Sequence, residues 1–402
     1  MGPFWALTLA LQISNSQPNP NLSFERPMEA IPLKKGRILE LSLGIGSGAF
    51  HSLKQSDDLI WTITDRGPNI KCEEALDVLG EDVCPDAKGR VLLVPEFTPR
   101  ILGWRVPQDG SNPVLVRSIP LKGSNGRFLS GRSNEFDGTT TEMLFDLSGA
   151  KLLPDPNGVD PEGIVRLKSG DFWISDENAA SILRIGADGI VKERLVTPSQ
   201  VSGLKNASYP VRGVLPEKLS RRHINRGLEG IALDEAGQKL YIMLQSPLDT
   251  ADGKREDGAR DVPIFSLALD AEGGFAAVAE EFIYRLDPIE ESAELKQSDV
   301  VASEITAVDG ELLVLENVGD QSKVYKIRPR SLQKAASKKK SAERAPVWLE
   351  KSLLWSETQN PNLEVPAKLE GMTLLDAHHL LLINDNDFGV KGERSQGVIV
   401  DL

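Results

Sequence analysis

Short apolar segments separated by polar turns run along most of the chain, and one arrangement of them repeats. In residues 160–180 a Glu-Gly pair opens an apolar segment, a turn with Gly and Asp follows, and a second apolar segment ends on carboxylates. A glutamate, an apolar segment, a turn and a second apolar segment with a polar end return in residues 227–248, 302–319 and 368–389, and a weaker copy in residues 46–69 has Ser47 in place of the glutamate. Because the apolar segments are short and bounded by turn residues, each copy predicts a β-hairpin.

The spacing of these copies predicts a β-propeller. Glu162, Glu229, Glu304 and Glu370 are separated by 66 to 75 residues, and further strand-like segments at residues 100–107, 181–196 and 263–287 lie between the copies. Repeated antiparallel hairpins with almost no amphipathic helices are typical of blades around a central channel. The five copies and the strand-rich residues 90–145 predict an all-β fold: a six-bladed propeller of four-stranded antiparallel blades. Two separate β-sandwich domains are the alternative.

The ends of the chain define the expected domain. Pairing of residues 397–402 with residues 36–43 would join the N- and C-terminal strands, close the ring and hide exposed strand edges. The propeller domain is therefore expected at residues 34–402, with residues 334–344 as a mobile basic loop. Within residues 1–20, residues 4–13 have the length of the apolar part of a signal peptide, although no Lys or Arg precedes them.

This N-terminal segment favours a periplasmic or extracellular location. In an oxidising compartment Cys72 and Cys84, twelve residues apart, are expected to form a loop disulfide, whereas a reducing cytosol would keep two free thiols. Apart from the N-terminal segment, no run of 18 apolar residues occurs, so no membrane span is expected.

The charge of the chain narrows the choice of partner. The formal net charge of −13 argues against nucleic acid, because phosphate contacts need a basic face. Cations and small molecules are better candidates. The glutamates of the repeated copies would converge at one mouth of the channel, and the acids after each second strand would lie near its rim: Asp65, Asp176, Glu177, Glu316, Asp385 and Asp387. Such oxygen ligands suit Ca²⁺, with Mg²⁺ as the alternative.

Each of these residues also has a purely structural interpretation. An Asp after a strand often closes a turn with its own side chain, and structural ion networks also gather acids. Arg66 and Arg226 stand next to the acids in sequence, where they either bind an anion beside the metal or serve as ion-pair partners. The G-x-S-x-G, P-loop and H-E-x-x-H patterns are absent from the sequence.

Several segments together resemble the phytase-like family described as "esterase-like activity of phytase". They are ITDRGPN (63–69), DPEGIV (160–165), NRGLEGIAL (225–233), SEITAV (303–308) and LEGMTL with LLLINDND (369–374, 380–387). The resemblance implies a secreted or periplasmic β-propeller that binds Ca²⁺ and hydrolyses phosphate monoesters. Gln245 and Ser47 depart from the acidic pattern, and the basic residues are few, so a monoester smaller than phytate is the better substrate.

The predicted function is a metal-dependent hydrolase at the channel mouth that acts, as a monomer, on a small anionic ester. The expected metal ligands are Glu162, Asp176, Glu229, Glu304, Glu370 and Asp385. Arg66 and Arg226 would stabilise the anion, and Asp65 or Glu316 would accept a proton from water. The alternatives are a single-metal lactonase or carboxylesterase, and a non-catalytic binding propeller stabilised by Ca²⁺.

Overall fold

β-strands form nearly all the regular structure of the protein. The computed structural model describes residues 21–54, 59–85, 88–107, 111–136, 141–290, 292, 295–319, 321–329 and 347–402 of the 402 residues, so the expected signal peptide and the basic loop at 334–344 lie outside the described residues. The α-helix in these ranges is α1 (Ala75–Leu79). The 3-10 turns are η1 (Lys34–Gly36), η2 (Cys72–Glu74), η3 (Pro198–Gln200), η4 (Ser202–Leu204), η5 (Glu217–Arg221), η6 (Gln297–Asp299), η7 (Glu357–Gln359) and η8 (Asp387–Gly389).

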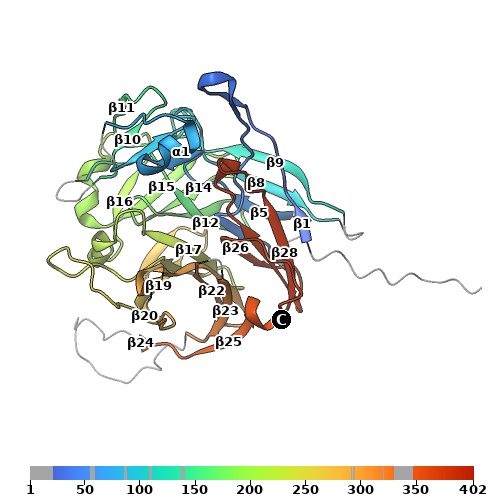
Figure 1. The fold of residues 1–402 in the computed structure, drawn as a ribbon. Helices are drawn as coiled ribbons and strands as arrows, with labels where there is room; N and C mark the ends of the chain where they lie inside the picture. Colours follow the sequence, from blue (N-terminus) through green and yellow to red (C-terminus); the bar gives the residue numbers. More distant parts are fainter. Residues whose placement is uncertain are drawn as a thin grey trace, which may run out of the picture.

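Five sheets stand around one axis like the blades of a propeller. In each of these sheets the innermost strand is the first strand of the repeated hairpin. Each innermost strand packs against the innermost strands of two other sheets, so the five strands form a closed ring. The inner strands are β4 (Gly48–Phe50), β12 (Pro161–Arg166), β17 (Leu228–Leu233), β21 (Val300–Val308) and β26 (Leu369–Leu374). In Figure 1, β12, β17 and β26 surround the centre of the view. The predicted all-β propeller is confirmed.

The blades are numbered here along the chain, and their strands follow from the inner strand outwards. Blade 1 adds β5 (Leu59–Ile63), β8 (Arg100–Arg105) and β9 (Val114–Pro120) to β4. Blade 2 adds β13 (Phe172–Asp176), β14 (Ser181–Ile185), β15 (Val191–Val196) and β16 (Val211–Gly213) to β12. Blade 3 adds β18 (Lys239–Leu244), β19 (Asp261–Leu269), β20 (Phe275–Arg285) and β24 (Val347–Trp348) to β17. Blade 4 adds β22 (Glu311–Val318), β23 (Gln321–Ile327) and β25 (Lys351–Ser356) to β21.

Blade 5 closes the ring with strands from both ends of the described chain. It consists of β26, β27 (His379–Asn384), β28 (Gln396–Asp401) and β1 (Asn21–Ser23). The antiparallel pairing of β1 with β28 joins Leu22 to Gly397, and the two strands lie side by side in Figure 1. Closure by N- and C-terminal strands is therefore confirmed, but the partner within residues 36–43 is wrong. There β3 (Ile38–Leu39) pairs instead with β2 (Ile31–Pro32).

The predicted count of six blades is not confirmed, because five inner strands already close the ring among the described residues. The strand-rich residues 90–145 are divided between two sheets. β8 and β9 complete blade 1, while β7 (Arg90–Leu92) and β10 (Leu144–Phe145) join β6 (Asn69–Lys71) and β11 (Lys151–Leu152) in a separate sheet, which we call the rim sheet.

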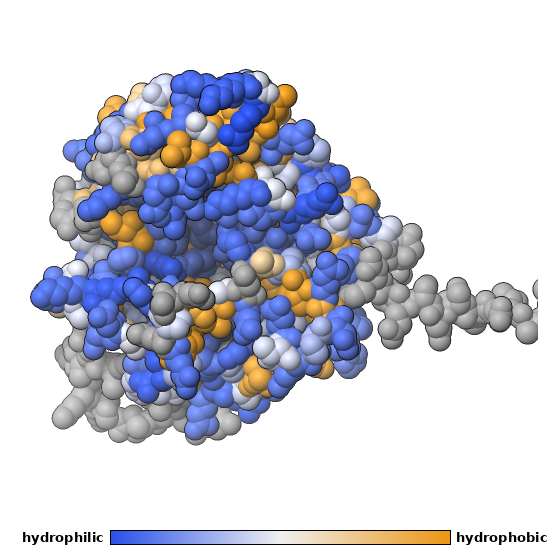
Figure 2. Space-filling view, in the orientation of Figure 1, coloured by the Kyte–Doolittle hydropathy of each residue, from blue (hydrophilic) through white to orange (hydrophobic). Residues whose placement is uncertain are grey.

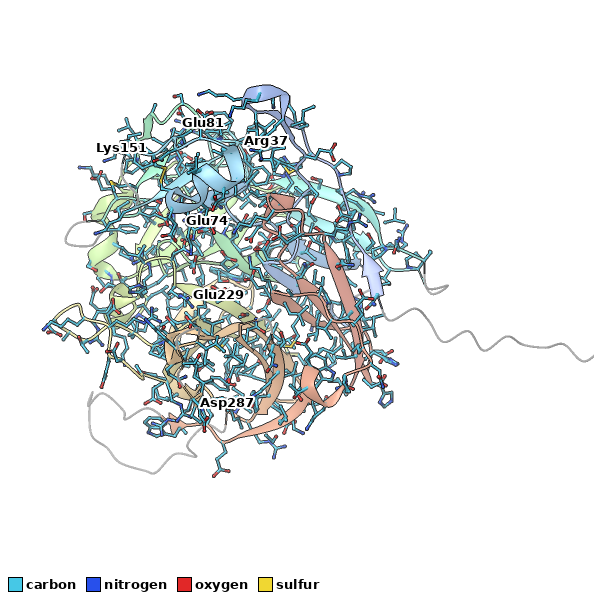
Figure 3. All side chains as sticks on the ribbon, viewed as in Figure 1. Arg37, Glu74, Glu81, Lys151, Glu229 and Asp287 are labelled. Atoms are coloured by element: carbon cyan, nitrogen blue, oxygen red, sulfur yellow. A yellow bond between two sulfur atoms is a disulfide. The ribbon has the colours of Figure 1, made fainter. Side chains whose placement is uncertain are left out.

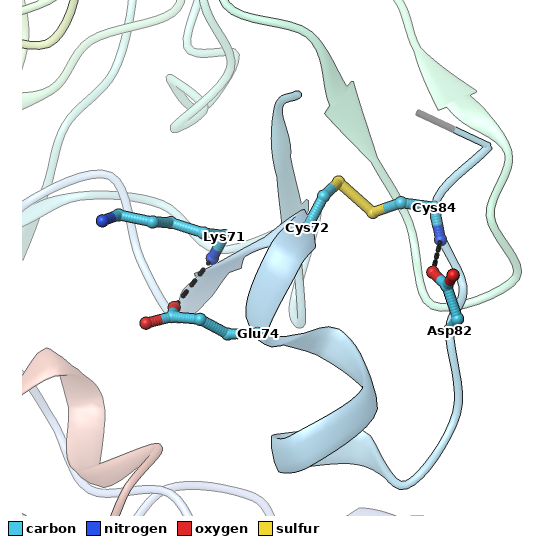
Figure 4. Close-up of a disulfide and its surroundings, with 5 residues drawn as sticks. All are labelled: Lys71, Cys72, Glu74, Asp82 and Cys84. Atoms are coloured by element: carbon cyan, nitrogen blue, oxygen red, sulfur yellow. Dashed lines mark hydrogen bonds between the residues drawn. A yellow bond between two sulfur atoms is a disulfide. The ribbon is translucent and has the colours of Figure 1, made fainter. Parts of the chain in front are cut away.

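The rim sheet carries the disulfide. Cys72 follows β6 directly and is bonded to Cys84 (Figure 4), so the first of the two sequence alternatives is confirmed. The Glu74 carboxylate accepts a hydrogen bond from the backbone N–H of Lys71 at 3.2 Å, which fixes the turn on the other side of Cys72. Lys391 of the loop between β27 and β28 also donates to Glu74 at 2.8 Å and ties this turn to blade 5.

The apolar core lies between neighbouring blades. The second strand of each hairpin is apolar on both faces because each face packs against a different blade. Trp61 of blade 1 meets Phe172 of blade 2 edge to face, with ring centroids 5.0 Å apart. One continuous cluster joins blades 2, 3 and 4, and other clusters join blades 4 and 5 and connect blade 1 with its neighbours.

A β-bulge recurs near the start of the inner strands. In blades 2, 3 and 5 the ladder to the second strand skips one residue, and the skipped residue is Glu162, Glu229 or Glu370. A bulged residue is left unpaired and its side chain is re-aimed, so these glutamates point away from the ladder. The glycine after each of them allows the next inner strand to approach closely: a Cβ at Gly230 would lie 2.8 Å from the backbone nitrogen of Ile305.

We expect Gly230→Ala to lower the free energy of unfolding by about 1–3 kcal/mol, because the added methyl group has no free space between β17 and β21. The measurement is urea unfolding followed by circular dichroism. Ala276→Val, which enlarges an exposed side chain on β20, is the control and should leave the midpoint nearly unchanged. Equal stability of Gly230→Ala and the control would contradict the close packing of the inner strands.

Candidate functional site

Two positions in every blade face the same mouth of the channel. The first is the bulge position near the start of the inner strand, and the second lies at or just beyond the end of the second strand. Hydrogen bonds join the two positions in blades 3 and 4, from Gln245 to Glu229 at 2.6 Å and from Asn317 to Ser303 at 2.8 Å. By the ladder register, the pairs in blades 1 to 5 are Ser47 with Asp65, Glu162 with Glu177, Glu229 with Gln245, Ser303 with Asn317, and Glu370 with Asp385.

The closest group of carboxylates lies in blade 2, near the start of β12 and the end of β13. Oxygen atoms of Asp160, Glu162 and Glu177 all lie within 4.8 Å of one another. The backbone supports this arrangement, because the N–H of Glu177 donates to the carbonyl of Asp160 at 3.0 Å. Asp160 and Glu177 are each 3% exposed, and Glu162 is partly exposed. Three oxygen ligands in one place match the preference of Ca²⁺ and Mg²⁺ for carboxylates.

Burial and mutual repulsion raise the pKa values of these acids. Burial, followed by the charge of Asp160, raises the pKa of Glu177 to about 8, although Arg66 and Arg226 oppose the shift. Burial, followed by the charge of Glu229, raises the pKa of Glu162 well above its ordinary value. In a protein without a cation, burial and repulsion favour the protonated forms of these acids, and Glu177, with a pKa of about 8, holds a proton at neutral pH.

The acidic group extends from blade 2 to the blades on either side. Burial and the charge of Asp385 raise the pKa values of both Glu370 and Asp65 well above their ordinary values. Burial, followed by the charge of Glu177, likewise raises the pKa of Glu229 well above its ordinary value. Blade 4 contributes only the neutral pair of Ser303 and Asn317, so the negative charge lies to one side of the axis, over blades 5, 1, 2 and 3.

Glu229 has an oxygen without a hydrogen-bond partner. Its Oε1 accepts the hydrogen bond from Gln245, while its Oε2 is buried and receives none. The residue is 2% exposed, and an unpaired buried carboxylate oxygen is costly. This oxygen is a vacant acceptor beside the carboxylates of blade 2.

Glu304 does not join the mouth, because its position in the ladder differs by one residue from the other three glutamates. In blade 4 the skipped residue is Ser303, so Glu304 occupies the position that is glycine in blades 2, 3 and 5. Its side chain is 1% exposed and its Oε1 accepts from the N–H of Ile305 at 2.8 Å. Burial raises the pKa of Glu304 well above its ordinary value, and the backbone N–H groups of Ala49 and Ile231, on two other inner strands, partly oppose the shift. Glu304 therefore sits inside the ring.

Asp176 and Glu316 also lie outside the acidic group. Asp176 directly precedes Glu177, and Glu316 directly precedes Asn317, so alternation along the strand turns both carboxylates away from the mouth. The Asp176 carboxylate binds the fully buried Arg194 and the hydroxyl of Ser181. Glu316 accepts from Tyr284 at 2.6 Å and from Lys351 at 2.7 Å.

Arg66 forms ion pairs with two acidic residues. Its guanidinium group binds Asp160 at 2.7 Å and also contacts Glu142, and the residue is 4% exposed. Glu142 in turn accepts from Arg90 of the rim sheet at 2.9 Å. This chain of ion pairs orients Asp160 and leaves no free face of Arg66 for a substrate anion.

Two other cations lie at the mouth. Lys368 binds Asp385 at 3.2 Å and Asp387 at 2.6 Å. Arg226 is close enough to lower the pKa values of Glu177 and Glu229 by its charge. Within the described part of the chain no ion pair is formed by Arg226, which makes it the better of the two predicted arginines for binding an anion.

Sequence reasoning missed three residues of this arrangement. Asp160 stands inside the repeated motif two residues before Glu162, and Lys368 has the same position before Glu370. A comparison of that position between the copies could have singled out both residues. Glu142 lies far from the motifs in sequence and carries no signal there, because only the rim sheet brings it to Arg66.

The hydrophilic surface around the channel mouth is consistent with the position of the acids. Figure 2 shows a hollow near the centre of this face, and the residues around it are hydrophilic. Glu229 lies near the centre of the same view in Figure 3, whereas Asp287, which binds Lys323 and Lys351, lies well away among blades 3 and 4.

The fold and the site define a β-propeller with an acidic channel mouth. Residues 47–388 match the family described as Phytase-like, esterase-like activity of phytase, and the chain belongs to this family. A relative from Arthroderma benhamiae, described as an uncharacterized secreted protein, is 27% identical over 295 residues, which are 64% of this chain and 54% of the relative. The chain thus spans about half the length of that relative.

Two solved structures are weakly similar to this chain over most of its length. The major Malassezia sympodialis allergen Mala s 1 gives a TM-score of 0.37 at 9% identity over 95% of this chain and 96% of that chain. The periplasmic gluconolactonase of Pseudomonas aeruginosa gives 0.34 at 10% identity over 86% and 85%. TM-scores this low leave the function to be argued from the residues of this chain. Among the described residues, no helix has the length and apolar character needed to cross a membrane.

The raised pKa of Glu177 predicts a pH-dependent stability in the presence of a chelator. Between the ordinary pKa near 4.5 and the folded-state value of about 8, the unfolded state has lost the proton that the folded state keeps, so the free energy of unfolding falls as pH rises. Glu177→Gln removes this penalty. Relative to the wild type, the variant should gain on the order of 1–3 kcal/mol between pH 5.5 and pH 8.5, since a tenfold change in proton affinity is about 1.4 kcal/mol.

Urea unfolding in EDTA at the two pH values measures this gain. Glu272→Gln, in an exposed turn of blade 3, is the matched control and should show no such pH-dependent gain. A gain that is larger at pH 5.5 than at pH 8.5 would show that the sign is wrong.

Proposed function

We propose that the channel mouth binds a hard divalent cation, with Ca²⁺ as the first candidate, and that the protein is a cation-dependent hydrolase of small esters. The observation that carries the proposal is the convergence of Asp160, Glu162 and Glu177, whose oxygens lie within 4.8 Å of one another. The other predicted ligands that fit are Glu229 and Glu370, with Asp385 beside them. Asp176 is left out because its carboxylate binds Arg194, and Glu304 is left out because the ladder of blade 4 places it one position away from the bulge.

The chemistry of the donor set supports a resident cation. Burial, followed by the charges of neighbouring acids, raises the pKa values of Glu162 and Glu229, and among the described residues the buried Oε2 of Glu229 has no hydrogen-bond partner. A divalent cation bound here would offset the repulsion between the carboxylates and would give the Oε2 of Glu229 a partner. Mg²⁺ is the alternative, but its demand for near-octahedral geometry and retained water suits a cluster of bulky carboxylates less well.

The residues around the cluster fit ester hydrolysis. A cation bound there lowers the pKa of a water molecule and polarises an ester oxygen. Asp65 is close enough to Asp385 and Asp160 for their charges to act on it, and we assign to it the acceptance of a proton from water. Arg226 would bind the negative charge that develops on the substrate. The family description and this arrangement make phosphate monoesters the first substrate class to test.

Carboxylic esters and lactones are the second substrate class, and one observation favours them. Arg66 is fully occupied by Asp160 and Glu142, so one of the two arginines expected to hold a phosphate group is not free. A mouth with so many carboxylates and one free arginine would repel a highly charged ester. A substrate that develops a single negative charge needs less cationic support.

We also propose that the protein acts outside the cytoplasm, in the periplasm or the extracellular space. The Cys72–Cys84 disulfide needs an oxidising compartment to persist. The relative from Arthroderma benhamiae is described as secreted, which agrees with this location.

Glutamine at both Glu162 and Glu229 should remove cation binding and hydrolysis together. We expect the affinity for Ca²⁺, measured by isothermal titration calorimetry, to fall at least about tenfold, which is about 1.4 kcal/mol. The variant should stay folded, because the substitutions remove repulsion. Glu272→Gln is the control, and unchanged Ca²⁺ affinity in the double variant would contradict the ligand assignment.

A substrate panel separates the remaining alternatives. Nitrophenyl phosphate, nitrophenyl acetate and γ-butyrolactone are each assayed with Ca²⁺ and with EDTA. Release of phosphate only with Ca²⁺ supports the first substrate class, and turnover of the other two supports the second. Ca²⁺-dependent melting without turnover of any substrate would identify a non-catalytic binding propeller instead.

A further inference from the structure

A second cavity lies at the opposite end of the channel from the acids. It measures about 220 Å³ and is enclosed by the far halves of the inner strands. All five blades contribute apolar side chains to its wall, among them Ala49, Phe50, Val165, Ile231, Ile305 and Leu374. None of the predicted site residues lines it.

The inner strands separate this cavity from the acidic mouth. Ala49, Ile231 and Ile305, which line the cavity, are also the three residues whose backbone N–H groups interact with the Glu304 carboxylate. Glycine at positions 48, 163 and 230 lets the strands meet with almost no space between them at this level. A ligand in the cavity therefore does not reach the acids.

Some of the charged groups around the opening are paired, and the exposed Lys168 and Asp309 lie there as well. Lys54 forms an ion pair with Glu235, and the Asp234 carboxylate accepts backbone hydrogen bonds from Gln238 at 2.7 Å and Lys239 at 2.9 Å. The imidazole Nδ1 of His51 bonds the carbonyl of Leu59 at 3.1 Å. These charged groups stay at the exposed opening, and the buried part of the wall, with Val165, Ile231 and Ile305, offers apolar contact.

We propose that this cavity is a binding site for one small uncharged apolar molecule, such as a monocyclic aromatic. Apolar cavities of about 150 Å³ in other proteins stay dry and bind benzene, and this one is larger. An apolar molecule in this cavity would gain dispersion contacts with the apolar side chains of its wall. The site is independent of the proposed cation site.

Fluorobenzene is a suitable probe, because its ¹⁹F signal reports binding directly. With the full chain we expect saturable line broadening and a Kd on the order of 1 mM, as befits a ligand of seven heavy atoms. Ala307→Leu fills the cavity from blade 4, and Ala377→Leu fills it from the exposed turn of blade 5, where the fold tolerates a larger side chain. Both variants should weaken binding at least about tenfold.

The control is Ala277→Leu on the exposed face of β20, which should bind like the wild type. EDTA and the double variant at Glu162 and Glu229 should also leave fluorobenzene binding unchanged, so this test stands apart from the proposed function. The proposal is overturned if the wild type shows no saturable effect, or if the filled variants bind as well as the wild type. It is also overturned if sedimentation shows that a second copy covers the opening, for example with the exposed Leu53.

Discussion

The close approach of the five inner strands is the constraint on which the rest of the structure depends. Five blades leave little room at the axis, and glycine at positions 48, 163, 230 and 371 lets neighbouring backbones meet there. In blades 2, 3 and 5 the residue before the glycine is a bulged glutamate, released from the ladder. The Glu-Gly pair therefore has two effects. Its glycine allows the inner strands to pack closely, and its unpaired glutamate turns away from the ladder and adds negative charge to the mouth.

This packing gives the channel two ends of opposite character. At the mouth, carboxylates from four blades are brought so close that burial and repulsion raise their pKa values, and Arg66, Arg226 and Lys368 offset only part of the charge. At the far end the same inner strands expose apolar side chains around a cavity. Glu304 lies between the two ends, where its Oε1 accepts a hydrogen bond from the N–H of Ile305.

Several features of the fold could be read from the sequence because they are local. Each of the five repeated copies forms the inner hairpin of a blade, since its apolar segments and turn residues specify two adjacent antiparallel strands. The disulfide was also predictable, because two cysteines twelve residues apart in one loop have few other partners. The site was predictable only in outline: Glu162, Glu229 and Glu370 share one position in the copies and reach the same mouth.

The sequence by itself thus determined the hairpins, the propeller class and the three glutamates that follow the common pattern. Tertiary structure decided the number of blades, the β1 partner of β28, and the placement of Glu304, Asp176 and Glu316 away from the mouth. The physical reason is the two-residue period of a strand: a shift of one position turns a side chain to the other face. Whether a glutamate is skipped in the pairing depends on the register between the inner strand and the second strand of its blade. The order of residue types in the sequence does not reveal that register.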